Sequence, residues 1–421
     1  MDWRKYKEKS EESAGIIGHF GLGFYSAFMV SDTVEIETLS YKEGAKPVHW
    51  VSAGEDSYEI EDGTRTEHGT TIIMNITEEE QEFLQESRIR EILHKYCQFM
   101  PYEIYLNPHD EERPVYDKDG NIEKNEGGTE KKRIVKPLPI NDIHPLWLKA
   151  PKDCTDEDYK AFYQKVFMDF NEPLFWIHLN VDYPFNLKGI LYFPKQLNRM
   201  EVMPGQVKLY SNQVFVADNI KEIIPEFLLL LKGVIDCPDM PLNVSRSFLQ
   251  NDGEVQKIAQ HITKKVSDKL HQIFKNDRPS YEKYWNDISA FIKFGCLKDE
   301  KFYDRMKDIL LFKTIDGEYK TLEEYPKAEG NKIYYVTDEN LQAQYISMFK
   351  ENGLTAAVLT HAIDPHFISL LEYKNPEEMK FLRIDADLGE ALKVSQPEAE
   401  SEDAKKAQEE ANKKAADEAA K

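Results

Sequence analysis

Two short segments combine residue types that suit contact with a phosphate group. In the first, Gly18, Gly21 and Gly23 precede the apolar run 24–30. Glycine lets backbone N–H groups approach a ligand closely, and the amino-terminal end of a following helix adds partial positive charge. A turn with no ligand is the alternative reading of the same glycines. The order Gly-x-x-Gly-x-Gly matches neither a P-loop nor the dinucleotide-binding fingerprint.

The second segment, residues 241–250, places an arginine near the start of a predicted helix. Asn243 or Ser245 can cap that helix. Arg246 and Gln250 lie four residues apart, so their side chains leave the same helical face one turn apart. The planar guanidinium group suits contact with phosphate oxygens. On the residues alone, a surface or ion-paired role for Arg246 remains the alternative.

The elements that must position the first segment form a small α/β unit. Apolar alternation and β-branched residues predict strands at 33–39, 48–52 and 69–76, and helical spacing predicts helices at 24–30 and 78–100. We interpret residues 1–108 as this first domain. Apolar periodicity is then lost, and residues 109–136 have the charged composition of a flexible linker.

A second α/β region is predicted over residues 137–385, with a large unit at 137–275, a helical segment at 276–310 and a small unit at 311–385. Its predicted helices are 156–170, 220–232, 255–275, 280–310 and 339–350, and its predicted strands are 186–193, 207–216, 332–336 and 356–359. Residues 386–421 are interpreted as a charged tail or the start of a further domain. The expected fold class is therefore α/β (α+β).

Composition limits the classes of partner. The formal net charge is −22 over 421 residues, which opposes binding to nucleic acid or to anionic membranes. We expect no membrane span, since the apolar stretches are far shorter than about 20 residues. The four cysteines stand far apart without metal-ligand spacing, so we expect reduced thiols, no metal site and a cytoplasmic location.

Residues 18–30, Gly-His-Phe-Gly-Leu-Gly-Phe-Tyr-Ser-Ala-Phe-Met-Val, resemble the second glycine motif of the Hsp90 chaperones, in their bacterial branch. The resemblance implies that this segment lies beside the triphosphate of ATP and hinges a lid over it. It also assigns Thr70, in the pair Gly69-Thr70, to the adenine end of the nucleotide. The implied cofactor-binding residues are Gly18, His19, Phe20, Gly21, Leu22, Gly23, Phe24, Thr70 and Arg246. His19 stands where the family more often has glutamine.

Residues 241–250 resemble the catalytic loop of the Hsp90 middle domain, Leu-Asn-x-Ser-Arg-x-x-Leu-Gln. The resemblance implies that Arg246 contacts the γ-phosphate of ATP and that Gln250 supports it, so both are the expected catalytic residues. The segment Pro145-Leu146-Trp147 resembles a family segment whose exposed tryptophan is linked to client contact, although a partly buried core position for Trp147 is the alternative. Residues 196–206 carry no aromatic residue, which departs from a client-facing loop often found there.

The resemblance implies a partial GHKL (Bergerat-type) ATPase sandwich followed by an Hsp90 middle domain. It implies an ATP-dependent chaperone that uses ATP with Mg²⁺, acts as a homodimer and binds unfolded clients and co-chaperones. The family's catalytic glutamate, magnesium-binding asparagine and adenine-reading aspartate motif have no counterpart in residues 1–14. We therefore expect no ATPase activity from this chain alone, and the alternative is a non-catalytic client- or co-chaperone-binding fragment. A gyrase-type or sensor-kinase-type ATPase is disfavoured by the arginine loop and by the acidic charge.

Overall fold

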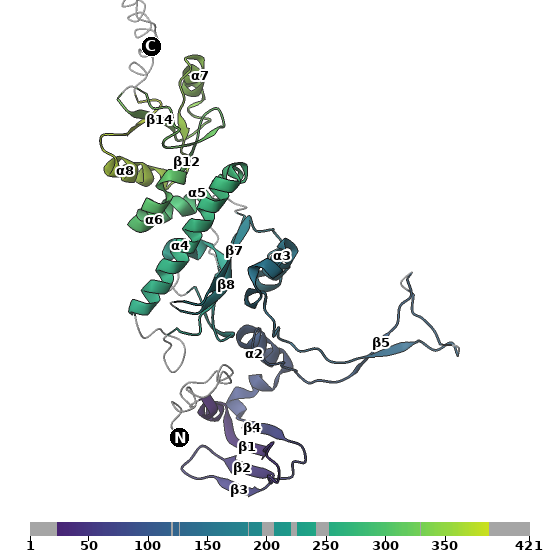
Figure 1. Cartoon of the computed structure of the whole chain (residues 1–421). Helices are drawn as coiled ribbons and strands as arrows, with labels where there is room; N and C mark the ends of the chain where they lie inside the picture. The colour runs from purple at the N-terminus through teal and green to yellow at the C-terminus, as the bar shows by residue number, and fades with distance from the viewer. Residues whose placement is uncertain are drawn as a thin grey trace, which may run out of the picture.

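The computed structural model describes residues 23–118, 121–125, 127–183, 185–195, 206–219, 225–240, 252–328 and 330–386. Figure 1 shows an antiparallel sheet near one end, a larger α/β unit in the middle and a small α/β unit toward the other end, with a thin ribbon projecting from the side. The fold is thus mixed α/β, as the sequence predicts. Across the described ranges, no helix is both long enough and apolar enough to cross a membrane.

The first sheet has four antiparallel strands in the order β3-β2-β1-β4. Its strands are β1 (Ser31–Leu39), β2 (Val48–Ser52), β3 (Glu59–Asp62) and β4 (Gly69–Ile76). Three of them agree with the predicted strands; β3, with two glutamates and an aspartate among four exposed residues, has too little apolar alternation to be predicted. The run expected as a helix is η2 (Gly23–Met29), a 3-10 helix that contacts β1.

The single helix predicted over 78–100 is two elements. η3 (Glu78–Leu84) is a 3-10 helix and α2 (Glu86–Cys97) an α-helix. They are separated by Gln85, whose φ of −83° and ψ of 124° are extended. Apolar spacing runs through both pieces and does not mark this break, so the periodicity predicts one helix where the backbone makes two.

The region expected to be a flexible linker instead contains a two-stranded antiparallel ribbon, β5 (Glu111–Pro114) with β6 (Lys132–Val135). Further bridges, Tyr116 to Ile122 and Lys124 to Glu130, continue it toward its tip. Opposite charges lie across from each other, with Lys132 Nζ 3.1 Å from Glu112 Oε2 and Lys131 Nζ 2.6 Å from Glu123 Oε2. The region is as highly charged as its sequence indicates. Composition alone, however, does not reveal that these charges pair across a ribbon.

The large unit is built on a five-stranded sheet of order β10-β9-β11-β8-β7. The strands are β7 (Phe175–Val181), β8 (Leu187–Phe193), β9 (Gln206–Ser211), β10 (Val214–Asp218) and β11 (Lys232–Asp236). β11 is parallel to β9, and the other pairs are antiparallel. The expected helix 220–232 is wrong in its described part: η6 (Glu226–Leu230) is short, and β11 begins at Lys232. The β-branched residues Val234 and Ile235 favour the strand.

Side chains alternate between the two faces of this sheet, and each face has its own helical layer. In β8, Leu191 and Phe193 enter the larger core, whereas Ile190 and Tyr192 enter the second. The second core is covered by α3 (Asp156–Phe167), which begins with a capping box between Thr155 and Asp158. The larger core is covered by α4 (Asp252–Asn276) and α5 (Arg278–Lys298). Figure 1 shows α4 and α3 on opposite sides of β7 and β8.

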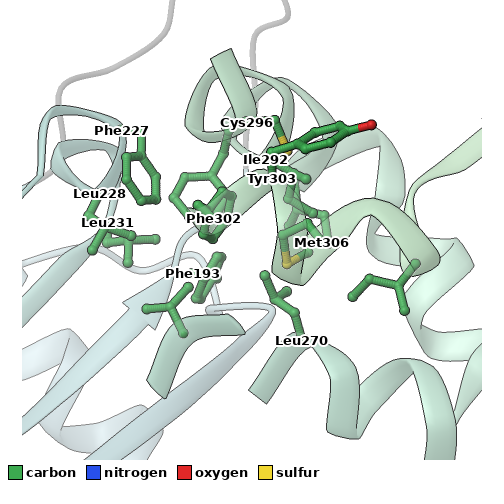
Figure 2. Packing of buried hydrophobic residues seen from close by; sticks show 14 of the residues in the cluster. Phe193, Phe227, Leu228, Leu231, Leu270, Ile292, Cys296, Phe302, Tyr303 and Met306 are labelled. Carbon is green, nitrogen blue, oxygen red and sulfur yellow. The ribbon is translucent and has the colours of Figure 1, made fainter. Parts of the chain in front are cut away.

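The larger core continues through the helical segment. Figure 2 shows Phe193 of β8, Phe227 of η6 and Phe302 of α6 (Glu300–Met306) converging on α5. The rings of Phe227 and Phe302 lie 4.7 Å apart. Gly295 permits this contact, because a Cβ there would lie 2.6 Å from the Phe302 ring.

The small unit has a parallel sheet of order β15-β14-β16 and a separate hairpin. Its elements are η7 (Lys307–Ile309), β12 (Leu311–Lys313), β13 (Tyr319–Thr321), β14 (Lys332–Val336), α7 (Ala343–Glu351), β15 (Ala357–Val358), α8 (Asp364–Lys374) and β16 (Lys380–Arg383). A buried ion pair joins it to the helical segment: Lys293 Nζ of α5 lies 2.5 Å from Asp364 Oδ1 of α8. The 3-10 turns η4 (Leu146–Leu148) and η5 (Pro151–Asp153) precede α3.

Candidate functional site

The predicted phosphate-binding turn lies mostly outside the described residues. Gly18, His19, Phe20, Gly21 and Leu22 fall there, while Gly23 and Phe24 open η2. Among the described residues, no atom lies within 4 Å of a Cβ placed on Gly23. The Phe24 ring packs against Trp50 at 5.7 Å between centroids, which anchors the start of η2 to the sheet.

Thr70 is the second residue of β4, an edge strand of the first sheet, and its side chain is exposed. Its hydroxyl oxygen lies 2.8 Å from that of Thr38 on β1. The preceding Gly69 has a φ of 133°, a backbone conformation that side-chain-bearing residues rarely adopt. The described residues leave Thr70 accessible but do not by themselves enclose a ligand around it.

The predicted catalytic residues, Arg246 and Gln250, lie outside the described residues. The structure describes both flanks of their segment: β11 ends at Asp236, and α4 begins at Asp252. On the strand side, the Cys237 N–H donates to the carbonyl of Tyr210 at 3.0 Å, and the Met240 N–H donates to Cys237. Asp239 Oδ2 accepts from the backbone N–H of Asn186 at 2.7 Å. The chain entering the arginine segment is therefore fixed by three independent hydrogen bonds.

Trp147 is not available for the client contact expected of it. Its side chain is 1% exposed and lies in the second core. Its ring centroid is 4.6 Å from that of Phe99 and 5.4 Å from that of Tyr210. The correction has a packing cause, since η4 places Trp147 against the sheet beneath α3, where it is enclosed by aromatic rings.

Asp236, the last residue of β11, is the buried acid beside Trp147 and Tyr210. It is 4% exposed, and its Oδ2 accepts from the backbone N–H of Gln213 at 3.0 Å. Burial raises the pKa of Asp236 to about 6, against the lowering effects of the Gln213 N–H and the nearby Trp147 indole. Within the described chain, Trp147 Nε1, Tyr210 Oη and Asp236 Oδ1 are buried with no hydrogen-bond partner of good geometry. The sequence signal for Asp236 is its place at the end of the stretch 232–236, which belongs to the resemblance to the Hsp90 middle domain.

Hydrogen bonds between residues 98–104 and residues 141–142 join the large unit to the region that carries the first sheet. We call this connection the strap. Asn141 donates from its amide to the carbonyls of Met100 at 2.9 Å and Tyr102 at 2.7 Å, and its Oδ1 accepts from the Ile104 N–H at 2.8 Å. The Asp142 N–H donates to the carbonyl of Gln98. These bonds hold the chain that follows α2 against the large unit.

Aromatic contacts reinforce the strap. Tyr96 of α2 lies 5.7 Å from Phe215 of β10 between ring centroids, and Phe99 is fully buried in the second core. Although α2 was assigned to the first domain from the sequence, its carboxyl end therefore packs as part of the large unit.

Comparison of the sequence with known proteins identifies the family of this chain. The family model described as Hsp90 protein matches residues 82–420, most of the chain. The chain therefore belongs to the Hsp90 family of molecular chaperones, which confirms the predicted resemblance.

Among individual relatives, the chain is similar to the chaperone protein HtpG of Porphyromonas gingivalis, with 45% identity over 392 residues, covering 91% of this chain and 55% of the relative. HtpG of Bacteroides fragilis is 45% identical over 402 residues, covering 93% and 56%. HtpG of Idiomarina loihiensis is 33% identical over 395 residues, covering 89% and 60%. The chain thus spans little more than half the length of these relatives. With about nine-tenths of the chain covered, the likeness extends into the first sheet, upstream of the family-model match.

Proposed function

We propose that this chain is the nucleotide-domain and middle-domain portion of an ATP-dependent HtpG-type chaperone that binds unfolded or partly folded client proteins. The match to HtpG relatives across 91% of the chain carries the proposal. Under this proposal, residues 1–108 form part of a GHKL-type ATPase sandwich, and residues 109–136 connect it to the next domain. Residues 137–385 form the middle domain, and residues 386–421 begin a further domain. Because α2 packs on β10, we place the boundary between the first domain and the middle domain before residue 108.

The proposed nucleotide contacts come from both regions. Residues 18–24 and Thr70 would contact ATP from the first region, and Arg246 would contact its γ-phosphate from the second. ATP with Mg²⁺ supplies the phosphoryl group, and a positioned guanidinium offsets negative charge as that group transfers. Gln250, one helical turn after Arg246, would hold the guanidinium in place.

The strap supports this proposal in physical terms. An arginine can act on a nucleotide held by another domain only if the two domains keep a defined relation. The Asn141 hydrogen bonds and the buried ring of Phe99 favour such a relation, and the bonds at Cys237 and Asp239 fix where the arginine segment begins. Preorganisation of this kind is what electrostatic catalysis requires.

The described residues fit the nucleotide only in part. No described residue crowds Gly23 and Thr70 offers an exposed hydroxyl, yet the two do not enclose a pocket. Among the described residues, no group of three or more histidine, cysteine, aspartate or glutamate side chains could hold a metal ion. The alternative is that the chain binds clients or co-chaperones without turnover. Homodimer formation and a cytoplasmic location belong to the proposal for the whole protein.

Calorimetric titration of Mg-ATP into the 421-residue chain tests the proposal, with Arg246→Ala as the variant and Arg305→Ala as a matched arginine substitution away from the segment. A nucleotide pocket retained in this chain would give wild-type binding that weakens several-fold in Arg246→Ala and persists in Arg305→Ala. Heat that is equal in all three proteins would contradict the role of Arg246. Silence in all three, together with suppressed aggregation of an unfolded client, would favour the non-catalytic alternative.

A further inference from the structure

A groove lies between α4 and the edge of the five-stranded sheet, and it adjoins a second hollow on a different face of the same helix. Its first section has a volume of about 470 Å³ and is lined by Tyr159, Trp176, His178, Lys265 and Lys269, among others. A second section of about 480 Å³ is lined by residues that include His271, Phe274, Lys275 and Ile309. Asp268 and Gln272 line both sections, so their side chains stand between the two.

The groove has the length and the edge that an extended peptide requires. From Lys265 to Gln272, the part of α4 that lines the first section, the helix rises about 10 Å, which equals roughly three residues of extended chain. β7 is the edge strand of its sheet, so its outer backbone groups have no strand partner within the described residues. Edge strands of this kind are common sites for the addition of a peptide strand. The shape favours a protein segment over a small ion.

The charges at the first section favour an acidic segment. Lys265 and Lys269 lie one turn apart on the same face of α4, and the described chain provides neither with an ion pair or a hydrogen bond. Burial lowers the pKa of Lys269, and Asp156 offsets this only in part. A carboxylate brought to this position would stabilise the half-buried ammonium group. Asp268 lines the first section together with the two lysines, and Asp308 lines only the second, so the first section keeps a net charge of about +1.

The wall opposite the lysines is aromatic and already ordered. Tyr159 and Trp176 stack at 4.9 Å between centroids, with 24° between their planes. The Tyr159 hydroxyl lies 2.8 Å from His178 Nδ1, and His178 Nε2 faces the carbonyl of Trp147 at 3.3 Å. Since both nitrogens of His178 are engaged, the imidazole holds the wall in place, and the lysines are the groups left to bind a ligand.

We propose that this groove binds an extended acidic segment of a partner protein, with carboxylates on Lys265 and Lys269 and an apolar side chain against Trp176. Such an interaction needs neither nucleotide nor Arg246, so it goes beyond the function proposed above. The chain has a net charge of −22, so most of its surface repels an acidic peptide. The pair of lysines therefore directs a negatively charged partner to this groove.

Fluorescence anisotropy of a pentapeptide, two acidic residues on either side of a phenylalanine and labelled with a neutral dye, tests the proposal on the full chain. We expect saturable binding that is weaker by fivefold or more in Lys269→Glu. The matched control is Lys264→Glu, an exposed neighbour on the same helix that does not line the groove, where affinity should stay within twofold. Replacing the peptide phenylalanine by alanine should weaken binding at least threefold.

Equal weakening in the two lysine variants would overturn the proposal, since it would reveal only an effect of overall charge. Absence of saturable binding to wild type would overturn it as well. Hydrogen exchange provides a readout that needs no substitution: bound peptide should slow exchange in residues 175–181 of β7. Unchanged exchange there at saturating peptide would place the binding elsewhere.

Discussion

The two main sheets of the molecule differ in how their faces are covered. In the five-stranded sheet, six of the seven residues of β8 are buried, and both faces carry helices. In the four-stranded sheet, β4 exposes Ile72, Ile73 and Met74 by 54%, 41% and 45%. The same kind of residue is thus a core residue in one sheet and a surface residue in the other. Stability in the described chain is concentrated in the large unit.

The largest expected effect comes from the larger core. Phe302→Ala should destabilise the large unit by about 4 kcal/mol, because it removes a fully buried ring and leaves a cavity. Ile73→Ala in the first sheet should cost less than about 1 kcal/mol, since that side chain is 41% exposed. Hydrogen exchange followed by mass spectrometry measures both, region by region. Comparable losses at the two sites would refute the contrast between the sheets.

The buried ion pair should come next. Lys293→Met should destabilise the contact between α5 and α8 by about 3 kcal/mol, because the carboxylate of Asp364, 1% exposed, loses its partner. The double variant Lys293→Met/Asp364→Leu should recover most of that loss, since no buried charge remains. Local opening of α8, measured by hydrogen exchange, reports both. A double variant as unstable as the single one would show that packing, rather than charge, dominates this joint.

Asp236 should give the large unit an unusual response to pH. Its folded-state pKa of about 6 lies above the ordinary 3.8, so the folded protein binds the proton more tightly than the unfolded protein does. Stability from this group is present below pH 4 and is lost as pH rises through 6, by up to roughly 3 kcal/mol. The stability of Asp236→Asn relative to wild type should therefore rise between pH 4 and 7.

Asp169 provides the opposite case in the same unit. Its carboxylate accepts from Lys232 at 2.6 Å and from Tyr163 at 2.7 Å. Although burial alone would raise the pKa of Asp169, these hydrogen bonds hold it below its ordinary value. Its stabilisation is present above pH 4 and is lost as pH falls below that, so Asp169→Asn should lose relative stability as pH rises from 2 to 5. Urea unfolding across this range compares the two variants, and parallel curves would contradict the assignment.

The smallest expected effect concerns helix capping. α3 begins with the capping box of Thr155 and Asp158, whereas α2 begins at Gln85 without a side-chain cap. Thr155→Ala should cost about 1 kcal/mol, and Gln85→Ser should stabilise α2 by a few tenths to 1 kcal/mol. Exchange of the first-turn amides of each helix measures both effects. A gain at Thr155→Ala would show that the box is not formed in solution.

Sequence reasoning succeeded where local pattern decides the structure. The strands at 48–52, 69–76 and 332–336 and the long helix α4 follow from alternation and helical spacing. It failed where tertiary contacts decide. The apolar run at 225–232 has helical composition, but its last residue belongs to β11. Val234 and Ile235 form the central strand of a sheet, and this tertiary pairing decides the structure there. Trp147 is enclosed by rings from β9 and from the chain after α2, which no local pattern reveals.

The candidate site shows the same division. The glycine turn and the arginine segment were found from residue types and family resemblance, and their geometry lies largely outside the described residues. Asp236 had no role assigned from the sequence, and its burial beside Trp147 and Tyr210 is what singles it out. Likewise, nothing in the sequence distinguishes Lys265 and Lys269 of α4 from the lysines on any solvent-exposed helical face.

The ribbon β5–β6 has a consequence for how the two regions are held together. The Ile140 N–H donates to the carbonyl of Ile104 at 2.8 Å, so the chain leaves for the ribbon and returns from it at one place. Between the two regions, the polypeptide therefore runs out along the ribbon and back. The noncovalent contacts that hold the regions together lie at the base of the ribbon and do not depend on it. A protease cut near the ribbon tip should yield two fragments that migrate as one particle, and shortening the ribbon should change the mass of the protein without changing the alignment of its halves.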